Sequence, residues 1–209
     1  MNSTIASVSG NEGLLIVVSG PSAVGKDTIL DRLLYESGQH RHPVRRCVTV
    51  TTREPRAGER DGIDYYFVNV SQFQKMAEDD GFLEYANVFG NWYGTPRQWV
   101  ADQRAAGTDV ILKIDVQGAL TVQERVSDAL LIFFTPPSLA ELERRLRARN
   151  TESEEQIARR LLDARNEMAQ MPHYDYVIVN ELVDNAVVDC AAVLRAEHCR
   201  VRRPASLQR

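Results

Sequence analysis

Residues 14–28 read LLIVVSGPSAVGKDT, and this stretch decides the fold of the chain. Leu14 to Val18 form an apolar run rich in β-branched residues, and the run stops at a Ser-Gly-Pro turn, as a buried parallel strand does where it enters a loop. Gly20, Gly25 and Lys26 then occupy the G-x-x-x-x-G-K frame of a phosphate-binding loop. The stretch predicts a strand, a phosphate loop and a helix, in that order.

The spacing of this loop suits a polyphosphate. Backbone N–H groups in a glycine-permitted loop converge on the anion, and the helix that follows adds partial positive charge at its N-terminus. The helix is expected from Asp27 to Glu36, because apolar residues there form one stripe. The alternative is an ordinary corner between a strand and a helix. The candidate phosphate-binding residues are Gly20, Pro21, Ser22, Ala23, Val24, Gly25, Lys26, Asp27 and Thr28.

Asp27 departs from the motif, because Ser or Thr usually follows the lysine and Thr28 comes one place late. Mg²⁺ accepts hard oxygen ligands and usually keeps several waters. Asp27 is therefore the candidate metal ligand, either directly or through a water molecule. The alternative is a helix-start acid that pairs with an arginine, with Thr28 or water serving the metal.

Composition narrows the class of protein. The chain has 209 residues, 44% of them hydrophobic and 26% charged, which is ordinary for one globular domain. A net charge of −4 argues against a nucleic-acid backbone as the main partner. Of the 25 basic residues only Lys26, Lys75 and Lys113 are lysines, and the arginines that make up the rest suit bidentate phosphate contacts, although coding bias gives the same excess.

The remaining composition bears on location. Cys47, Cys190 and Cys199 have no metal-ligand spacing and favour free thiols in a reducing cytoplasm. No apolar run is long enough for a membrane span, and the first residues lack the pattern of a signal peptide. We therefore expect a cytoplasmic protein without a membrane partner, with flexible ends at residues 1–13 and 201–209.

A second anion site is expected after a short strand at Cys47 to Thr51. Arg53, Arg56 and Arg60 follow it among prolines and glycines, so they lie on a loop and not on a solvated helix face. Farther on, Ser71 is expected to cap a short helix. Glu84 and Tyr93 are the candidates for function in an aromatic-rich stretch that also supplies core residues, which we expect to be Phe82, Phe89 and Trp92.

Later strands complete the expected sheet. Residues 110–114 form a buried strand that ends at Asp115, and Gln117-Gly118 are expected to turn away from it. An acid at the carboxyl end of a parallel strand lies where ligands gather in this architecture. The alternative is that Asp115 caps the next helix. Further strands are expected at residues 130–134 and 176–179, the latter ended by Asn180.

An arginine-rich helical hairpin is expected between the last two strands. Its first helix covers residues 138–149, and Thr151 or Ser153 caps the second, which carries Arg159 and Arg160. In an acidic chain, such a hairpin suggests a lid that closes over phosphates.

The blocks GPSAVGK, TTREPRAGE, DYYFV, FLEYANVFGNWYGT, IDVQGA, PPS and RRL occur in the order found in guanylate kinases, and the chain resembles that family from Leu14 to about Leu194. The resemblance implies an α/β fold: a P-loop kinase core (residues 14–47, 99–137 and 161–200) with a parallel sheet flanked by helices. It also implies a small mixed α/β GMP-binding subdomain (48–98) and a helical lid (138–160). The implied reaction is transfer of the terminal phosphoryl group of ATP to GMP with Mg²⁺, by a monomer or homodimer.

The resemblance also implies residue roles. The catalytic residues would be Lys26, Arg53, Arg145, Arg149 and Arg160. The ATP site would comprise the phosphate loop through Thr28 with Arg145, Arg149 and Asn180. The GMP site would comprise Thr49, Arg53, Arg56, Glu59, Tyr65, Glu84, Tyr93, Thr95 and Asp115. Independently of the resemblance, a carboxylate such as Glu84 accepts the paired N1 and amine donors of guanine and repels adenine N1.

Three residues depart from the family pattern: Asp27, Lys113, which stands where an acid is common, and Asn150, which stands where glycine is common. Asp27 is shared with guanylate-kinase-like phosphokinases of ribose bisphosphate, which have no need of the two guanine-site blocks. A non-catalytic guanylate-kinase-like interaction module is the other alternative, but it would lack the lysine and glycines of the loop.

Overall fold

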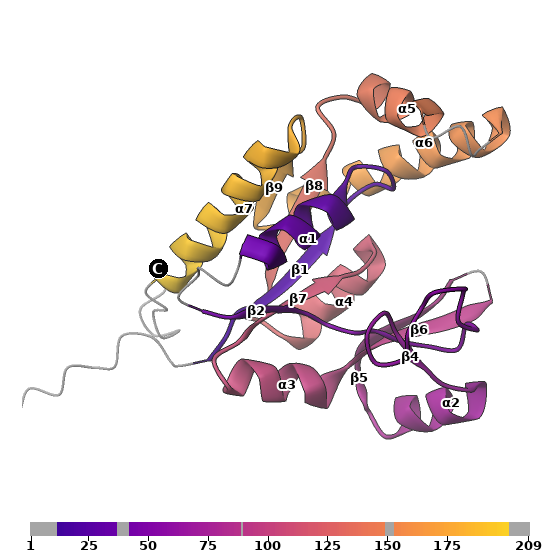
Figure 1. Cartoon of the computed structure of the whole chain (residues 1–209), viewed down its shortest axis with the longest axis vertical. Coiled ribbons are helices and arrows are strands. Elements are labelled where there is room, and N and C mark those ends of the chain that lie inside the picture. Colours follow the sequence, from indigo (N-terminus) through magenta and orange to yellow (C-terminus); the bar gives the residue numbers. More distant parts are fainter. Residues whose placement is uncertain (1–11, 37–41, 89, 149–152, 201–209) are drawn as a thin grey trace, which may run out of the picture.

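The computed structural model describes residues 12–36, 42–88, 90–148 and 153–200 (Figure 1). Within these ranges the core is a five-stranded parallel sheet with the strand order β2-β7-β1-β8-β9. Its strands are β1 (Leu15–Ser19), β2 (Val44–Arg46), β7 (Asp109–Lys113), β8 (Leu130–Thr135) and β9 (Tyr176–Val179). The expected α/β class with a parallel sheet flanked by helices is confirmed.

Helices cover both faces of the core sheet, because the side chains of the buried strands alternate between its faces. Ile16 and Val18 of β1 belong to one hydrophobic cluster, whereas Leu15 and Val17 belong to another on the opposite face. The covering helices are α1 (Lys26–Glu36) and α7 (Val183–His198) on the first face and α3 (Arg97–Ala105) and α4 (Val116–Arg125) on the second.

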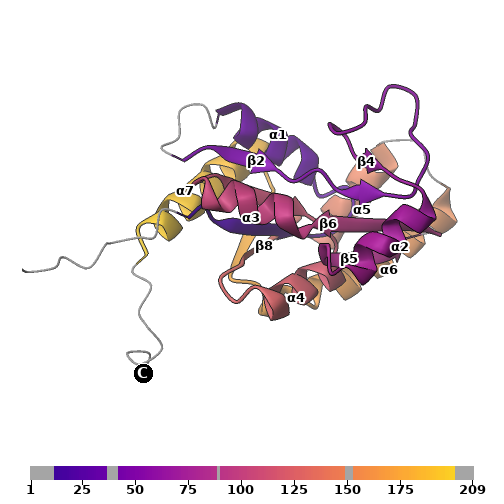
Figure 2. The same ribbon diagram turned by 90° about the horizontal axis from the view of Figure 1, so that it is seen from below.

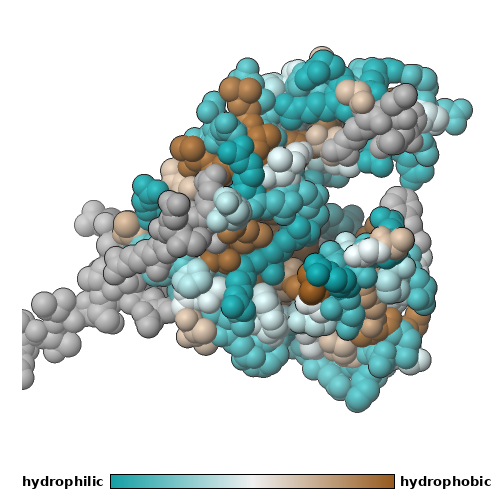
Figure 3. Space-filling view, in the orientation of Figure 1, coloured by the Kyte–Doolittle hydropathy of each residue, from teal (hydrophilic) through white to brown (hydrophobic). Residues whose placement is uncertain are grey.

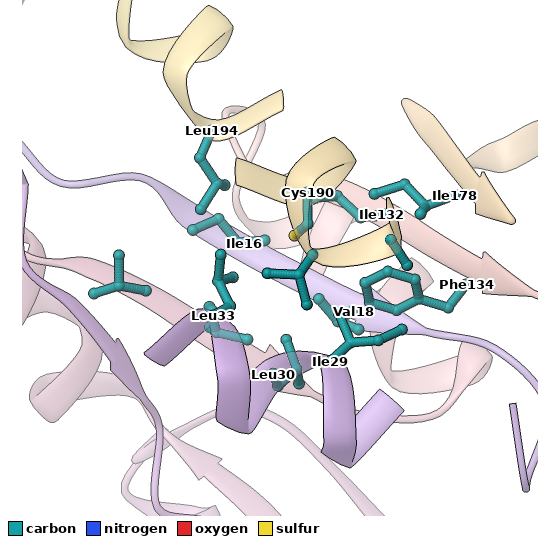
Figure 4. Packing of buried hydrophobic residues seen from close by; sticks show 14 of the residues in the cluster. Ile16, Val18, Ile29, Leu30, Leu33, Ile132, Phe134, Ile178, Cys190 and Leu194 are labelled. Carbon is teal, nitrogen blue, oxygen red and sulfur yellow. The ribbon is translucent and has the colours of Figure 1, made fainter. Parts of the chain in front are cut away.

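Figure 4 shows the first of these clusters from close by. Ile29, Leu30 and Leu33 of α1 are fully buried and meet Cys190 and Leu194 of α7 over the sheet (Figure 4). The apolar stripe expected on the first helix is therefore the face that packs on the core. This packing anchors α1, whose N-terminus carries the phosphate loop.

A second, four-stranded mixed sheet has the order β4-β3-β6-β5 and is covered by helix α2. Phe73 of α2 stacks between Phe82 and Trp92, with ring centroids 4.6 and 5.9 Å away. Phe82 is buried as expected and Trp92 is half-buried, while Phe89 lies outside the described residues. The elements are β3 (Val50–Thr51), β4 (Tyr66–Phe67), α2 (Val70–Glu78), β5 (Phe82–Val88) and β6 (Asn91–Pro96).

Helices α5 (Leu139–Ala148) and α6 (Glu154–Met168) form a hairpin, followed by a short 3₁₀ helix at Met171–His173. Leu142, Leu146 and Ile157 form the centre of this hairpin. Figure 1 shows the hairpin and the second sheet on different sides of the core, and Figures 1 and 2 both show them toward the end of the core sheet where β1 meets the phosphate loop. Within the described residues, no helix has both the length and the apolar character to cross a membrane.

The expected single strand at Cys47 to Thr51 is wrong. The stretch begins after β2 has ended in the core sheet and runs into β3 of the second sheet, so Cys47 to Thr49 cross between the two. The backbone N–H of Cys47 still donates to Ile111 O at 2.9 Å, whereas Thr49 O already accepts from Tyr66 N at 2.9 Å. A β-branched run predicts extended backbone, but it does not specify which sheet the backbone joins.

Two local expectations also fail. Asn69 and not Ser71 caps α2, because Asn69 and Gln72 exchange side-chain and backbone hydrogen bonds in a capping box. Gln117 and Gly118 do not turn away from the strand; both lie inside α4, whose N-cap is Asp115. Glycine is a poor helix former by itself, so its place in the first turn has to come from packing.

Candidate active site

The phosphate loop, residues 20–25, joins β1 to α1. Gly20 has φ +139°, and a Cβ there would lie 2.0 Å from the carbonyl oxygen of Phe134. Gly25 has φ +97°, and a Cβ there would lie 2.6 Å from Nδ2 of Asn180. Only glycine fits these two positions without displacing neighbours, and the resulting loop places backbone amides at the N-terminus of α1, where anions bind.

Lys26 folds back over its own loop in this structure. Its Nζ donates to the carbonyl oxygens of Gly20 and Pro21, the latter at 2.9 Å. Burial lowers the pKa of Lys26 to about 8, against the opposing charge of Glu167. The ammonium group therefore lies among carbonyl oxygens that an incoming phosphate can replace.

Asp27 and Thr28 follow on the first turn of α1, and both are exposed. Asp27 pairs with two basic groups: its Oδ1 lies 2.5 Å from Nζ of Lys113 and 3.4 Å from the guanidinium of Arg46. Partial burial acts to raise the pKa of Asp27, but the hydrogen bond and positive charge of Lys113 outweigh it and hold the pKa below its ordinary value. We call Asp27, Lys113 and Arg46 the Asp27 cluster. The alternative interpretation of the sequence expected Asp27 to pair with an arginine. The structure contains such a pair with Arg46, although Lys113 is the closer partner.

The loop between β3 and β4, together with Tyr93 of β6, brings five of the expected residues close to one another. Arg53 donates to both carboxylate oxygens of Glu59, at 2.8 and 2.9 Å, and the backbone N–H of Arg56 donates to the same carboxylate at 2.8 Å. The Arg53 guanidinium lies 5.3 Å from the centre of the Tyr65 ring, and Tyr65 meets Tyr93 edge-on at 6.0 Å. Glu59 thus holds the guanidinium of Arg53 in a fixed orientation, through one of its two terminal nitrogens.

Glu84 is a buried acid, only 6% exposed, on β5. Thr95 donates its hydroxyl to Oε1 of Glu84 at 2.5 Å. A Cβ on Gly118 would lie 2.9 Å from Oε2, so the glycine in α4 leaves room for the carboxylate. Burial raises the pKa of Glu84, with Asp115 adding to the effect and the Thr95 hydrogen bond opposing it. A fixed, half-satisfied carboxylate of this kind can accept a pair of donors from a ligand.

Asp115 caps α4 by accepting a hydrogen bond from Gly118 N at 2.8 Å. The side chain is nevertheless exposed, so the capping role and a ligand-binding role are compatible.

Thr49 lies elsewhere, in a pocket of about 210 Å³ between the crossing segment and β7. That pocket is lined by Arg46, Cys47, Val48, Thr49, Glu59, Ile63, Asp64, Tyr65 and Lys113. It joins three of the expected residues, but it does not include Glu84, Tyr93, Thr95 or Asp115.

The hairpin contributes two arginines to the edge of the phosphate loop. Arg145 donates to the backbone oxygen of Asn180 at 2.9 Å, and Arg160 donates to Oγ of Ser22 at 2.7 Å. Arg149 lies outside the described residues. Figure 3 shows the surface hollowed between this hairpin and the second sheet, with hydrophilic side chains along both sides.

Asn180 links the end of β9 to the phosphate loop. It is 2% exposed, and its Nδ2 donates to the carbonyl oxygen of Val24 at 2.7 Å. Its Oδ1 is buried and has no hydrogen-bond partner among the described residues. Through this side chain and its contact with Arg145, Asn180 couples the position of the hairpin to the loop.

Sequence reasoning gave no role to Arg46, Lys113 or Gly118. Arg46 and Lys113 end adjacent parallel strands, β2 and β7, and the carboxyl ends of such strands are where ligands gather, so position alone was a usable signal. Gly118 gave no such signal, because its importance arises from contact with Glu84, which is distant in the sequence.

Comparison with known proteins agrees with this geometry. The family model described as guanylate kinase matches residues 12–197. Guanylate kinase of Desulfitobacterium hafniense is 48% identical over 193 residues, which cover 92% of this chain and 94% of that protein. Guanylate kinase of Caldanaerobacter subterraneus is 44% identical over 192 residues, which cover 92% of this chain and 91% of that protein. The crystal structure of guanylate kinase from Anaplasma phagocytophilum matches with a TM-score of 0.72 at 34% identity, covering 94% of this chain and 92% of that one. The chain therefore belongs to the guanylate kinase family.

Proposed function

We propose that this protein transfers the terminal phosphoryl group of ATP to GMP, and more weakly to dGMP, within purine nucleotide metabolism. The observation that carries the proposal is the buried carboxylate of Glu84, held by Thr95 and given room by Gly118. Guanine offers N–H donors at N1 and at the exocyclic amine, whereas adenine N1 is an acceptor and faces the carboxylate with repulsion. Membership of the guanylate kinase family supports the same substrate.

The proposed roles divide between donor and acceptor. We assign ATP to residues 20–28 of the loop and helix start, with Arg145, Arg149 and Asn180. We assign GMP to Thr49, Arg53, Arg56, Glu59, Tyr65, Glu84, Tyr93, Thr95 and Asp115. We propose that residues 48–98, which contain the second sheet and α2, are the GMP-binding subdomain. We propose that residues 138–160, which contain α5 and the first part of α6, are the lid on a core of residues 14–47, 99–137 and 161–200.

Phosphoryl transfer needs positioning and charge neutralisation more than a covalent nucleophile. Lys26 exchanges loop carbonyls for phosphate oxygens, and Arg53 presents a guanidinium already oriented by Glu59. Arg145 and Arg160 lie at the edge of the phosphate loop. When the hairpin closes, it brings both arginines over the transferred phosphoryl group and excludes water from the site. We assign no general base.

We propose Mg²⁺ as the cofactor of ATP and Asp27 as the residue that holds it. The Asp27 carboxylate is a hard oxygen donor, is 63% exposed and lies on the first turn of α1 beside the phosphate loop, so it fits the ion once Lys113 and Arg46, which pair with it here, have moved away. When bound, Mg²⁺ neutralises charge on the phosphates.

Asp27→Ala is expected to raise the magnesium concentration for half-maximal rate several-fold, because the oxygen ligand is lost. Asp27→Ser is expected to keep activity with a shifted magnesium optimum, since a hydroxyl replaces the carboxylate. Magnesium titrations at saturating ATP and GMP measure both effects. If both variants overlay the parent curve and only stability changes, Asp27 is a helix-start residue with a purely structural role.

We also propose a cytoplasmic location, a monomeric or homodimeric state and no nucleic-acid partner. Cys47, Cys190 and Cys199 are free thiols in this structure, as a reducing compartment maintains them.

The proposed function is tested by a coupled assay of ADP release with a panel of acceptors. We expect GMP to give the highest kcat/KM, followed by dGMP, with AMP, CMP and UMP far lower. Preference for AMP would contradict the role of Glu84. Preference for ribose 1,5-bisphosphate would assign the chain to the other kinase branch of the guanylate-kinase-like proteins.

A further inference from the structure

Lys113 is a partly buried lysine that lies between residues assigned to ATP and residues assigned to GMP. It ends β7 and pairs in register with Val18 of β1, directly before the phosphate loop. Its Nζ donates to Oδ1 of Asp27 at 2.5 Å, and its side chain is 26% exposed. The ammonium group is therefore held at the start of α1 by the carboxylate of Asp27.

The same side chain lines the pocket of about 210 Å³ that also contains Thr49 and Tyr65. Thr49 and Tyr65 belong to the region assigned to the acceptor. Lys113 is thus in contact with the start of α1 on one side and with the acceptor pocket on the other.

The local charges favour an anion in this pocket. Lys113 and Arg46 both pair with Asp27. Lys26 is also near: burial is the main cause that lowers the pKa of Lys26, and the positive charge of Lys113 adds to it. Of the two acids that line the pocket, Glu59 is paired with the Arg53 guanidinium, whereas Asp64 accepts from the backbone N–H of Arg60 at 2.8 Å and keeps its charge. A phosphate group can carry two negative charges, so it competes with the single charge of Asp27 for Lys113 and Arg46.

We propose that Lys113 is a binding residue for the phosphate of the acceptor nucleotide, to which its ammonium group moves from Asp27 when the acceptor enters the pocket. The inference deepens the proposed function, because it rests on a nucleoside monophosphate as acceptor. Asp27 then serves as a holder for Lys113 in the free protein and competes with the acceptor for it.

The first test measures GMP binding by isothermal titration calorimetry in the presence of EDTA, so that no divalent metal contributes. Lys113→Met is expected to weaken GMP binding about 10-fold or more, since a charge-assisted hydrogen bond is lost. Lys113→Arg is expected to stay within about 3-fold of the parent, because the charge remains. Lys75→Met is the matched control: it removes the same charge from an exposed site on α2, where the side chain is 76% exposed, and should bind GMP as the parent does.

The second test separates binding from a merely structural pairing. Asp27→Asn weakens the hold on Lys113, so it is expected to tighten GMP binding about 3-fold, the opposite direction to Lys113→Met. The double variant is expected to bind GMP as weakly as Lys113→Met alone. A role limited to stabilising α1 would make both single variants change in the same direction. Thermal unfolding midpoints of all variants show whether folding contributes.

Two ligands identify which phosphate is recognised. Binding of guanosine, which has no phosphate, should not differ between the parent and Lys113→Met. If Lys113→Met weakens ADP but leaves GMP unchanged, Lys113 serves the donor and the proposal is wrong; if it affects neither, Lys113 only pairs with Asp27 and the proposal is again wrong. Either result leaves phosphorylation of GMP by the parent protein unaffected, so the proposed function is judged separately by the acceptor panel.

Discussion

Replacing Lys26 by methionine is expected to lower kcat/KM for ATP about 100- to 1,000-fold, in line with the loss of one preorganised charged donor to the transferred phosphates. Lys26 already lies among the carbonyl oxygens of Gly20 and Pro21, so the charge is in place before the nucleotide binds. Methionine matches the length of the side chain but supplies no donor. Steady-state kinetics with saturating GMP and varied ATP measure the loss.

Folding has to be separated from chemistry in this experiment, because Lys26 also bonds its own loop. Lys75→Met is again the control, and it should keep parental kinetics. The thermal unfolding midpoint of Lys26→Met should stay close to that of the parent, since Ile29, Leu30 and Leu33 still anchor α1 to the core. A loss of activity below about 3-fold would remove Lys26 from the transfer step.

Glu84→Gln is expected to reduce the preference for GMP over AMP about 10- to 100-fold in kcat/KM. The charge-assisted pair to guanine, worth about 1.5–3 kcal/mol, is lost, and the amide can turn a donor toward adenine N1. The hydroxyl of Thr95 can still donate to the amide oxygen, so folding should be little affected. Glu78→Gln, the same change at an exposed position on α2, is the matched control.

The pH dependence gives an independent check on Glu84. Burial raises the pKa of Glu84, so the carboxylate loses its charge at a higher pH than an ordinary glutamate does. The KM for GMP of the parent should therefore rise as the pH falls toward that pKa, while Glu84→Gln should lack this rise. Titration of the GMP phosphate affects both proteins alike, so the difference between the two profiles isolates Glu84. Identical profiles, together with an unchanged GMP to AMP ratio, would place Glu84 outside the guanine site.

The order of strands and helices was accessible from local pattern. The apolar run before Gly20 predicts a buried strand, and the stripe of Ile29, Leu30 and Leu33 predicts the helix that packs on it, because burial on one face needs that periodicity. The glycine positions Gly20 and Gly25 were also accessible, since only glycine permits the backbone that the loop requires.

Local pattern failed where a residue's state depends on a partner far away in the sequence. The stretch from Cys47 to Thr49 is extended, as its composition predicts, but hydrogen bonds to Ile111 and Tyr66 decide that it crosses between sheets. The N-cap of α2 is a different case, because the deciding bonds are local. Asn69 and Gln72, three residues apart, exchange hydrogen bonds, and these make Asn69 the N-cap in place of Ser71.

By itself the sequence determined the α/β class, the phosphate loop and the motif blocks of the guanylate kinase family, because propensity, periodicity and glycine conformation act over a few neighbouring residues. Only the tertiary structure decided which charges meet. Asp27 and Lys113, each a departure from the family pattern, form an ion pair between α1 and β7, and Gly118 gives Glu84 its space. Such contacts depend on how strands and helices pack, which brings together residues that no local rule connects.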